Sequence, residues 1–257
     1  MALNFKTFGQ GYPVIILHGL FGMLDNWQTI AKKLADKYTV YIVDQRNHGR
    51  SPHLSEFNYQ ILADDLQAFM ESNWIYEAHI IGHSMGGKTA MQLALSYPEI
   101  VKKLIVVDIA PKQYQPGHQL IFDALQSLDL TTITNRKEAA TRLGATINDP
   151  GVQQFLLKNL SRNSNGQYEW KMNLPVIYKN YNRILENIQM EEPFQQPTLF
   201  IKGGQSNYIQ EMDNPTIKNF FPVAKIETIP QAGHWVHAAA PNELLDLVHN
   251  FFKKSEE

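Results

Sequence analysis

The chain contains no cysteine, which excludes disulfide bonds, thiolate catalysis and cysteine-based metal sites. No stretch approaches the roughly 18 consecutive apolar residues that a membrane-spanning helix needs. The N-terminal residues also lack a long apolar segment of the kind found in secretion signals. We therefore expect a soluble, cytoplasmic protein that does not insert into membranes.

Charge and ligand patterns are equally sparse. The net charge is only −2, so binding to nucleic acid or to an acidic membrane surface is not expected. The nine histidines are dispersed without an H-E-x-x-H pattern, and no G-x-G-x-x-G run follows a predicted strand. We expect neither a metal ion nor an organic cofactor.

The remaining composition fits one large α/β domain of 257 residues, with 44% hydrophobic and 19% charged residues. Short apolar strands alternate with helices, which predicts a mostly parallel central sheet flanked by helices. Strands are predicted at 3–8, 14–17, 39–43, 79–81, 101–107, 197–201 and 225–229, and helices at 26–34, 59–72, 88–95, 209–220 and 241–252. In the helix at 59–72, Asp64 and Asp65 are predicted to face outward.

Residues 112–192 interrupt this alternation. They show no strong strand, and their helical patches lie at 119–128, 136–143, 152–159 and 176–188. We interpret the segment as a helical cap inserted into an α/β core that comprises residues 1–111 and 193–257. Seven of its larger apolar and aromatic side chains either face a pocket or pack within the cap: Tyr114, Phe122, Leu125, Leu156, Trp170, Met172 and Tyr178.

The most informative stretch surrounds Ser84. A short predicted strand is followed at once by Gly82-His83-Ser84-Met85-Gly86, a G-x-S-x-G motif, and then by a predicted helix. So tight a turn between strand and helix needs glycines that lack a Cβ, and it puts the serine at a strained backbone angle. The hydroxyl is then presented at the carboxyl edge of the sheet, which predicts that Ser84 is a nucleophile.

A serine hydroxyl needs a base, and an imidazole suits that task near neutral pH. His234 follows the last predicted strand and lies on the same sheet edge as Ser84, whereas His237 points elsewhere if a helical turn follows. In a fold of this kind the acid usually lies in the loop that follows the strand predicted here at 197–201. Residues 203–208 of that loop contain neither Asp nor Glu. Asp108 ends the preceding sheet strand and is the candidate acid, the alternative being that it caps a turn.

Supporting groups follow from the same logic. Ser206 stands about where the missing acid would be, so it is expected to hydrogen-bond Asp108 or His234. The backbone N–H groups of Leu20 and Met85 are candidates for an oxyanion hole.

Other polar residues near the predicted site are assigned structural roles. His18 is expected to be a partner within its own loop rather than a base. Asp44, Arg46 and His48 could resemble an acid–base cluster, and we expect them to order the loop at 44–51 instead.

Four stretches carry a resemblance to a known family: 18–22, 44–51, 82–88 and 233–234. Over nearly its whole length the chain resembles a serine esterase of the α/β-hydrolase fold, and the order Ser, Asp, His is also that family's order. The absence of an acid at 203–208, together with Val-Asp-Ile-Ala-Pro at 107–111, resembles a narrower group of small bacterial esterases and thioesterases. The eukaryotic abhydrolase-domain-containing protein 11 is similar to that group.

The resemblance implies hydrolysis of esters with short to medium acyl chains, with acyl-CoA thioesters as a further option. A carbon–carbon bond hydrolase or a perhydrolase would use the same triad. A ligand-binding module that has kept a hydrolase scaffold is the alternative from another class, although an intact Ser, His and Asp set weighs against it. The physiological substrate and the oligomeric state stay open at this stage.

The triad hypothesis predicts that Ser84→Ala, His234→Ala and Asp108→Asn each lower turnover by orders of magnitude, with the smallest loss for Asp108→Asn, because triad members act as a unit. Ser206→Ala should cost much less. Steady-state kinetics on a simple ester measures all four variants. Full activity in Asp108→Asn would move the acid to another residue.

Overall fold

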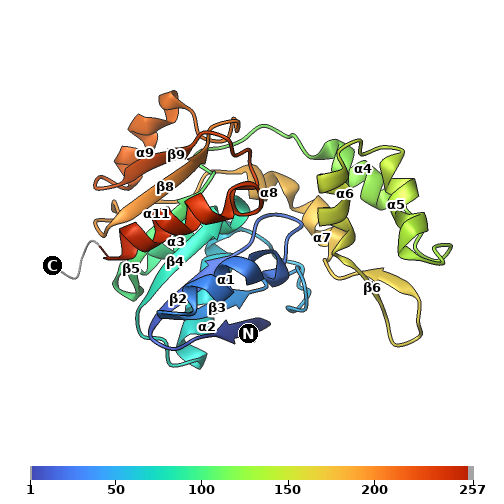
Figure 1. Cartoon of the computed structure of the whole chain (residues 1–257), viewed down its shortest axis with the longest axis horizontal. Coiled ribbons are helices and arrows are strands. Elements are labelled where there is room, and N and C mark those ends of the chain that lie inside the picture. Colours follow the sequence, from blue (N-terminus) through green and yellow to red (C-terminus); the bar gives the residue numbers. More distant parts are fainter. Residues whose placement is uncertain (1, 254–257) are drawn as a thin grey trace.

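A computed structural model describes residues 2–253, and a seven-stranded sheet organises it (Figure 1). The strand order is β1-β3-β2-β4-β5-β8-β9, and every neighbouring pair is parallel except β1 and β3. The strands are β1 Phe5–Phe8, β2 Tyr12–Leu17, β3 Tyr38–Val43, β4 Ala78–His83, β5 Val101–Val107, β8 Thr198–Gly203 and β9 Lys225–Ile229. The predicted α/β class is confirmed, and all seven predicted strands are present.

Burial along the strands explains this order. All six residues of β4 are buried, whereas β1 and β9 at the two edges are largely exposed. A strand covered on both faces must be apolar throughout, and the side chains of Ile80 and Ile81 meet that demand on opposite faces. The centre of the sheet therefore coincides with the strand that leads into Ser84.

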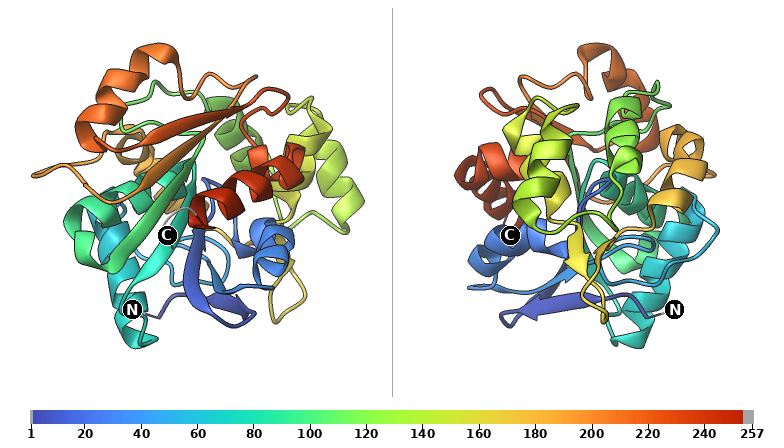
Figure 2. Two further views of the ribbon diagram at one scale, coloured as in Figure 1. Left: turned by 60° about the vertical axis from the view of Figure 1, so that its left-hand side comes forward. Right: turned by 90° about the vertical axis from the view of Figure 1, so that its right-hand side faces the viewer.

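Helices cover both faces of the sheet (Figure 2). On one face α2 and α3 contribute Leu66, Phe69 and Leu93 to the larger apolar core, and on the other α1 and α11 contribute Ile30 and Val248 to a second core. The helices of the α/β core are α1 Gln28–Leu34, α2 Tyr59–Ser72, α3 Met85–Ser96, α9 Asn214–Phe220, α10 Val236–Ala239 and α11 Pro241–Lys253. No helix within residues 2–253 is long and apolar enough to span a membrane.

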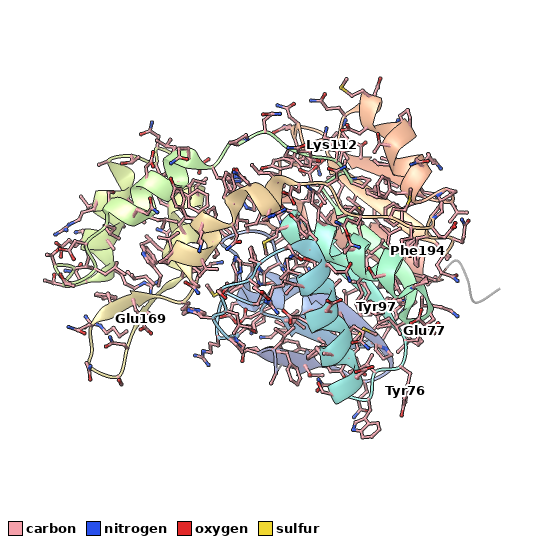
Figure 3. The ribbon with its side chains drawn as sticks, turned by 180° about the vertical axis from the view of Figure 1, so that it is seen from behind. Tyr76, Glu77, Tyr97, Lys112, Glu169 and Phe194 are labelled. Atoms are coloured by element: carbon pink, nitrogen blue, oxygen red, sulfur yellow. The ribbon has the colours of Figure 1, made fainter. Side chains whose placement is uncertain are left out.

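The chain between β5 and β8 forms a separate group of short elements beside one end of the sheet (Figure 1). They are α4 Gln119–Ser127, α5 Arg136–Gly144, α6 Pro150–Leu157, β6 Leu160–Arg162, β7 Tyr168–Trp170, α7 Leu174–Lys179 and α8 Tyr181–Leu185. The sequence shows no strong strand in this segment, and the structure adds two strands of three residues, β6 and β7, which pair as an antiparallel hairpin that carries Glu169 (Figure 3). Its turn places Gly166 at a positive φ of 79°, which glycine adopts readily.

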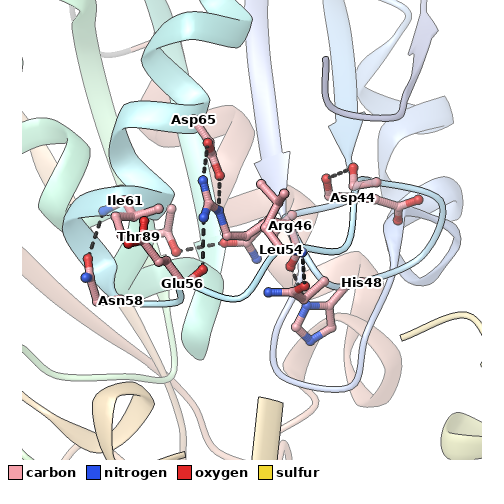
Figure 4. Close-up of polar contacts among 12 residues, drawn as sticks. Asp44, Arg46, His48, Leu54, Glu56, Asn58, Ile61, Asp65 and Thr89 are labelled. Carbon is pink, nitrogen blue, oxygen red and sulfur yellow. Dashed lines mark hydrogen bonds and ion pairs between the residues drawn. The ribbon is translucent and has the colours of Figure 1, made fainter. Parts of the chain in front are cut away.

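The loop at 44–51 is held by its own polar contacts (Figure 4). Asp44 accepts hydrogen bonds from the backbone N–H groups of Leu24 and Arg50 at 2.7 and 2.9 Å, and His48 Nδ1 donates to the Arg46 carbonyl at 3.0 Å. These contacts match the loop-ordering role expected for the three residues.

The predicted outward orientation of Asp65 is wrong. Asp65 is 8% exposed and forms a two-point ion pair with Arg46, with Nη2 2.7 Å from Oδ1 and a second contact from Nε to Oδ2 (Figure 4). The guanidinium also donates to the Glu56 carbonyl at 2.9 Å. The charge is tolerated inside the molecule because the planar fork of the arginine matches the carboxylate.

This buried pair predicts that removing Arg46 destabilises the protein far more than removing a lysine from an exposed ion pair. Arg46→Ala leaves Asp65 buried without its partner and should lower the free energy of unfolding by about 3–5 kcal/mol. Lys6→Ala is the control, because the Lys6–Asp25 pair has side chains 47% and 45% exposed and should cost less than about 1 kcal/mol. Urea denaturation measures both, and equal losses would contradict the assignment.

Candidate active site

Ser84 occupies the turn between β4 and α3 with φ of 54° and ψ of −120°. This is a strained conformation for a residue with a side chain. The turn is compact because a Cβ on Gly82 would lie 2.2 Å from the Gly86 carbonyl oxygen. The Ser84 N–H donates to the Val107 carbonyl at 3.0 Å, which ties the turn to β5. The predicted strand, tight turn and helix are therefore all present around this serine.

Three side chains from different loops meet in one line of hydrogen bonds. Nε2 of His234 lies 3.0 Å from the Ser84 hydroxyl oxygen, and Nδ1 lies 2.7 Å from Oδ2 of Asp108. Asp108 follows β5, is fully buried and has a positive φ of 52°, and His234 lies in the loop after β9. An imidazole in this position can take the hydroxyl proton while its other nitrogen donates to the carboxylate.

The Asp108 carboxylate has two further partners, one at the end of β8 and one in the loop that follows it. Oδ1 accepts the Gly203 N–H at 2.9 Å, and Oδ2 accepts a hydrogen bond from the Ser206 hydroxyl. The expected contact of Ser206 is thus with Asp108. These donors hold the carboxylate in position beside the imidazole.

Two neighbours that the sequence interpretation missed contact His234, one at its backbone and one at its ring. His83 Nε2 donates to the His234 carbonyl at 2.8 Å. The Tyr208 ring stacks on the imidazole with centroids 3.8 Å apart and planes 15° apart. His83 is part of the motif itself, so its place beside Ser84 was a usable signal, whereas Tyr208 comes from a loop without a recognisable pattern.

Of the other histidines near Ser84, His18, His83 and His237 are buried and His118 is partly buried, and burial shifts all four towards the neutral form. It lowers the pKa of His18, His118 and His237 to about 4 in each case, and the pKa of His83 falls well below its usual value. His18 has the structural role expected of it, because Nδ1 donates to the Gly19 carbonyl of its own loop at 2.9 Å, and Nε2 also accepts the Gln45 N–H at 3.0 Å. His237 stacks on Trp27 at 4.5 Å and makes no hydrogen bond to Ser84.

Two cavities meet at Ser84, with volumes of about 250 and 160 Å³. Leu20 lines both, and Met85 lines the smaller one. Of the seven side chains in 112–192 that could have faced a pocket, Tyr114 lines the smaller cavity, and Phe122, Leu125, Leu156 and Met172 are buried in the core. Trp170 packs against that core, and Tyr178 is 41% exposed. His118, Ile121 and Phe155 face the larger cavity instead.

Lys88 is a further residue of the site that the sequence interpretation did not select. It lies four residues after Ser84 on α3, lines the smaller cavity and is 1% exposed. A signal was available, because Lys88 is the one charged residue of an otherwise uncharged helix, Met85–Ser96.

Comparison with known proteins places the chain in a family. A family described as the alpha/beta hydrolase fold matches residues 12–241, and the chain belongs to that family. Its members named below support hydrolysis of carboxylic esters as the class of activity, in agreement with the resemblance drawn from the motifs.

Similar proteins come from an animal, a bacterium and a marine microorganism. The chain is 37% identical to the mouse protein named sn-1-specific diacylglycerol lipase ABHD11 over 93% of this chain and 80% of the relative. It is 36% identical to esterase YbfF of Escherichia coli K12 over 93% and 92% of the two chains. The solved structure of a marine microorganism esterase superposes with a TM-score of 0.95 at 46% identity, covering 97% and 98%.

The tight turn predicts that Gly82→Ala is poorly tolerated. The added methyl group would meet backbone atoms of Gly86 and Gly87, and a displacement of Ser84 by about 1 Å should lower kcat/KM roughly 100-fold. Gly233→Ala is the control, because a Cβ there would meet nothing within 4 Å, and its stability should change by less than about 0.5 kcal/mol. Thermal melts and ester kinetics test both, and an active Gly82→Ala protein would refute the steric argument.

Proposed function

We propose that the protein is a serine hydrolase that cleaves carboxylic esters through an acyl-enzyme on Ser84. The observation that supports this most is the unbroken line of hydrogen bonds from the Ser84 hydroxyl through His234 to the Asp108 carboxylate. A serine hydroxyl is a weak nucleophile near neutral pH, and an imidazole held by a carboxylate is what makes it reactive.

The reaction has two halves. In the first, Nε2 of His234 takes the Ser84 proton while the serine oxygen attacks the ester carbonyl, and the same nitrogen then protonates the departing alcohol. In the second, a water molecule gives a proton to Nε2 and attacks the acyl-enzyme, and Nε2 then returns a proton to the Ser84 oxygen as the acid is released. Asp108 accepts the Nδ1 hydrogen bond throughout, which fixes the imidazole tautomer and stabilises its charged form.

The tetrahedral intermediate places negative charge on the former carbonyl oxygen. We assign the oxyanion hole to the backbone N–H groups of Leu20 and Met85, because both residues line the cavity at Ser84. Met85 is the first residue of α3, and the first N–H groups of a helix have no partner within it. Removing one such donor typically costs about 100- to 1,000-fold in turnover.

Two supporting assignments complete the proposal. Ser206 orients the Asp108 carboxylate through its hydroxyl hydrogen bond. Residues 112–192 act as a cap on a core made of 1–111 and 193–257, which is supported by the His118 and Phe155 side chains that this segment contributes to the cavity wall.

The proposed substrates are esters with short to medium acyl chains. This size is supported by the two modest cavities at Ser84, of about 250 and 160 Å³. Acyl-CoA thioesters are included, because the same acyl-enzyme forms when a thiolate is the leaving group in place of an alkoxide.

A serine-directed phosphonate probe tests the proposal directly. It should label the wild-type protein at Ser84, leave Ser84→Ala unlabelled, and label His234→Ala much more slowly because the hydroxyl loses its base. A series of p-nitrophenyl esters beside acyl-CoAs should then give the highest kcat/KM between about C2 and C8. Absence of labelling would favour a binding module, and a maximum at C12 or longer would contradict the proposed chain length.

A further inference from the structure

The smaller cavity at Ser84 holds a positive charge that the proposed reaction does not use. Lys88 lies about one helical turn after Ser84, so the two side chains share a face of α3. Among the described residues that line this cavity, Lys88 is the one Lys, Arg, Asp or Glu, and the rest are mainly apolar or aromatic. The cavity therefore combines an apolar wall with a single cation.

The Lys88 ammonium has hydrogen-bonding capacity left for a ligand. It donates to the carbonyls of Leu185 and Glu186 at 3.3 and 2.5 Å, and it lies 5.3 and 4.9 Å from the Tyr59 and Tyr114 ring centroids. An ammonium has three N–H donors, and no carboxylate within residues 2–253 pairs with this one. Burial lowers the pKa of Lys88 to about 7, and a carboxylate beside it would raise that pKa again.

Nearby hydroxyl groups are already engaged. The Tyr59 hydroxyl donates to the Ile184 carbonyl at 2.6 Å, and the Tyr114 hydroxyl donates to the Tyr208 carbonyl at 2.6 Å. These tyrosines therefore supply ring surface to the cavity. The ammonium is the charged group of this cavity, which is otherwise lined by neutral side chains such as the amides of Gln115 and Asn207, and an anionic end of a substrate would pair with it.

The position of His234 decides which part of an ester enters this cavity. Because its Nε2 atom must protonate the leaving oxygen, the alcohol lies on the His234 side. His234 lines the larger cavity and does not line the smaller one, whose wall includes Met85 and Lys88. The acyl group therefore extends into the smaller cavity, and Lys88 lies about 6 Å further along the helix axis than Ser84.

We propose that the Lys88 ammonium binds a carboxylate at the far end of the acyl group, so that monoesters of dicarboxylic acids are preferred substrates. The inference rests on the proposed ester hydrolysis at Ser84. Water adds across the ester bond, the alcohol leaves, and the product is the dicarboxylate. An incoming carboxylate gives the buried cation a charged partner in direct contact, whereas the Glu186 carboxylate of the protein acts on it only without an ion pair.

The first test compares matched esters on the wild-type protein. The monoethyl esters of succinic, glutaric and adipic acid are paired with ethyl 4-methylpentanoate, 5-methylhexanoate and 6-methylheptanoate, in which an isopropyl group replaces the carboxylate. At one chain length or more, the acidic ester should have a kcat/KM at least about tenfold higher than its neutral partner. Preference for the neutral ester at all three lengths would overturn the proposal.

The second test removes the charge. Lys88→Met should lower the ratio of acidic to neutral kcat/KM roughly 30-fold or more, mainly through KM, and change the neutral ester little. Lys102→Met is the matched control, because Lys102 pairs with Glu77 at 3.5 Å, has a side chain that is 53% exposed and lies outside this cavity. It should leave the ratio within about threefold.

Equal losses for both esters in Lys88→Met would mean that the lysine only anchors the Leu185 and Glu186 carbonyls, which overturns the proposal. A thermal melt checks folding, and if Lys88→Met does not fold, Lys88→Gln and the wild-type series decide. Ser84→Ala distinguishes a failure of the Lys88 assignment from a failure of the proposed ester hydrolysis, because it should abolish turnover of every ester. Ser84-dependent hydrolysis without an acidic preference refutes the Lys88 assignment alone, whereas hydrolysis that survives Ser84→Ala refutes the proposed function.

Discussion

The close approach of the backbone at Gly82 to the Gly86 carbonyl is the constraint on which the site depends. A side chain at Gly82 would lie 2.2 Å from that oxygen, so glycine alone lets β4 turn so abruptly into α3. The turn forces Ser84 to a φ of 54°, and the sheet holds it there through the hydrogen bond from its N–H to Val107. Because buried strand and helix maintain this conformation, the hydroxyl faces the cavity without any rearrangement.

Sheet order explains how residues far apart in the chain meet at that hydroxyl. β4, β5, β8 and β9 are consecutive neighbours and parallel, so their carboxyl ends deliver Ser84, Asp108, Ser206 and His234 to one edge. Since β5 lies between β4 and β8, a carboxylate at its end can reach the imidazole and also accept the Gly203 N–H. An acid in the loop after β8 is therefore not required, and that loop supplies a hydroxyl donor in its place.

Strands and the serine turn could be predicted because each follows from one short run of sequence. Buried parallel strands are apolar throughout, and the G-x-S-x-G turn is dictated by sterics. Asp65 and Lys88 could not be placed in the same way. Helical periodicity predicts that a charged side chain faces solvent, and only knowledge of its partner would predict burial. The partners are Arg46 from a loop and the carbonyls at the end of α8. The hairpin β6–β7 has strands of three residues, too short for any alternation to stand out.

The two cavities share part of their wall, since Leu20, Gly117, His118 and Tyr208 border both. A change at this common neck alters the fit of both halves of an ester together, so selectivity for acid and for alcohol cannot evolve independently there. Residues that border one cavity only, such as Ile184 on the acyl side and Phe155 on the alcohol side, are free of that coupling. Substitutions at those outer positions, natural or engineered, can therefore change the preference for the acid or for the alcohol separately.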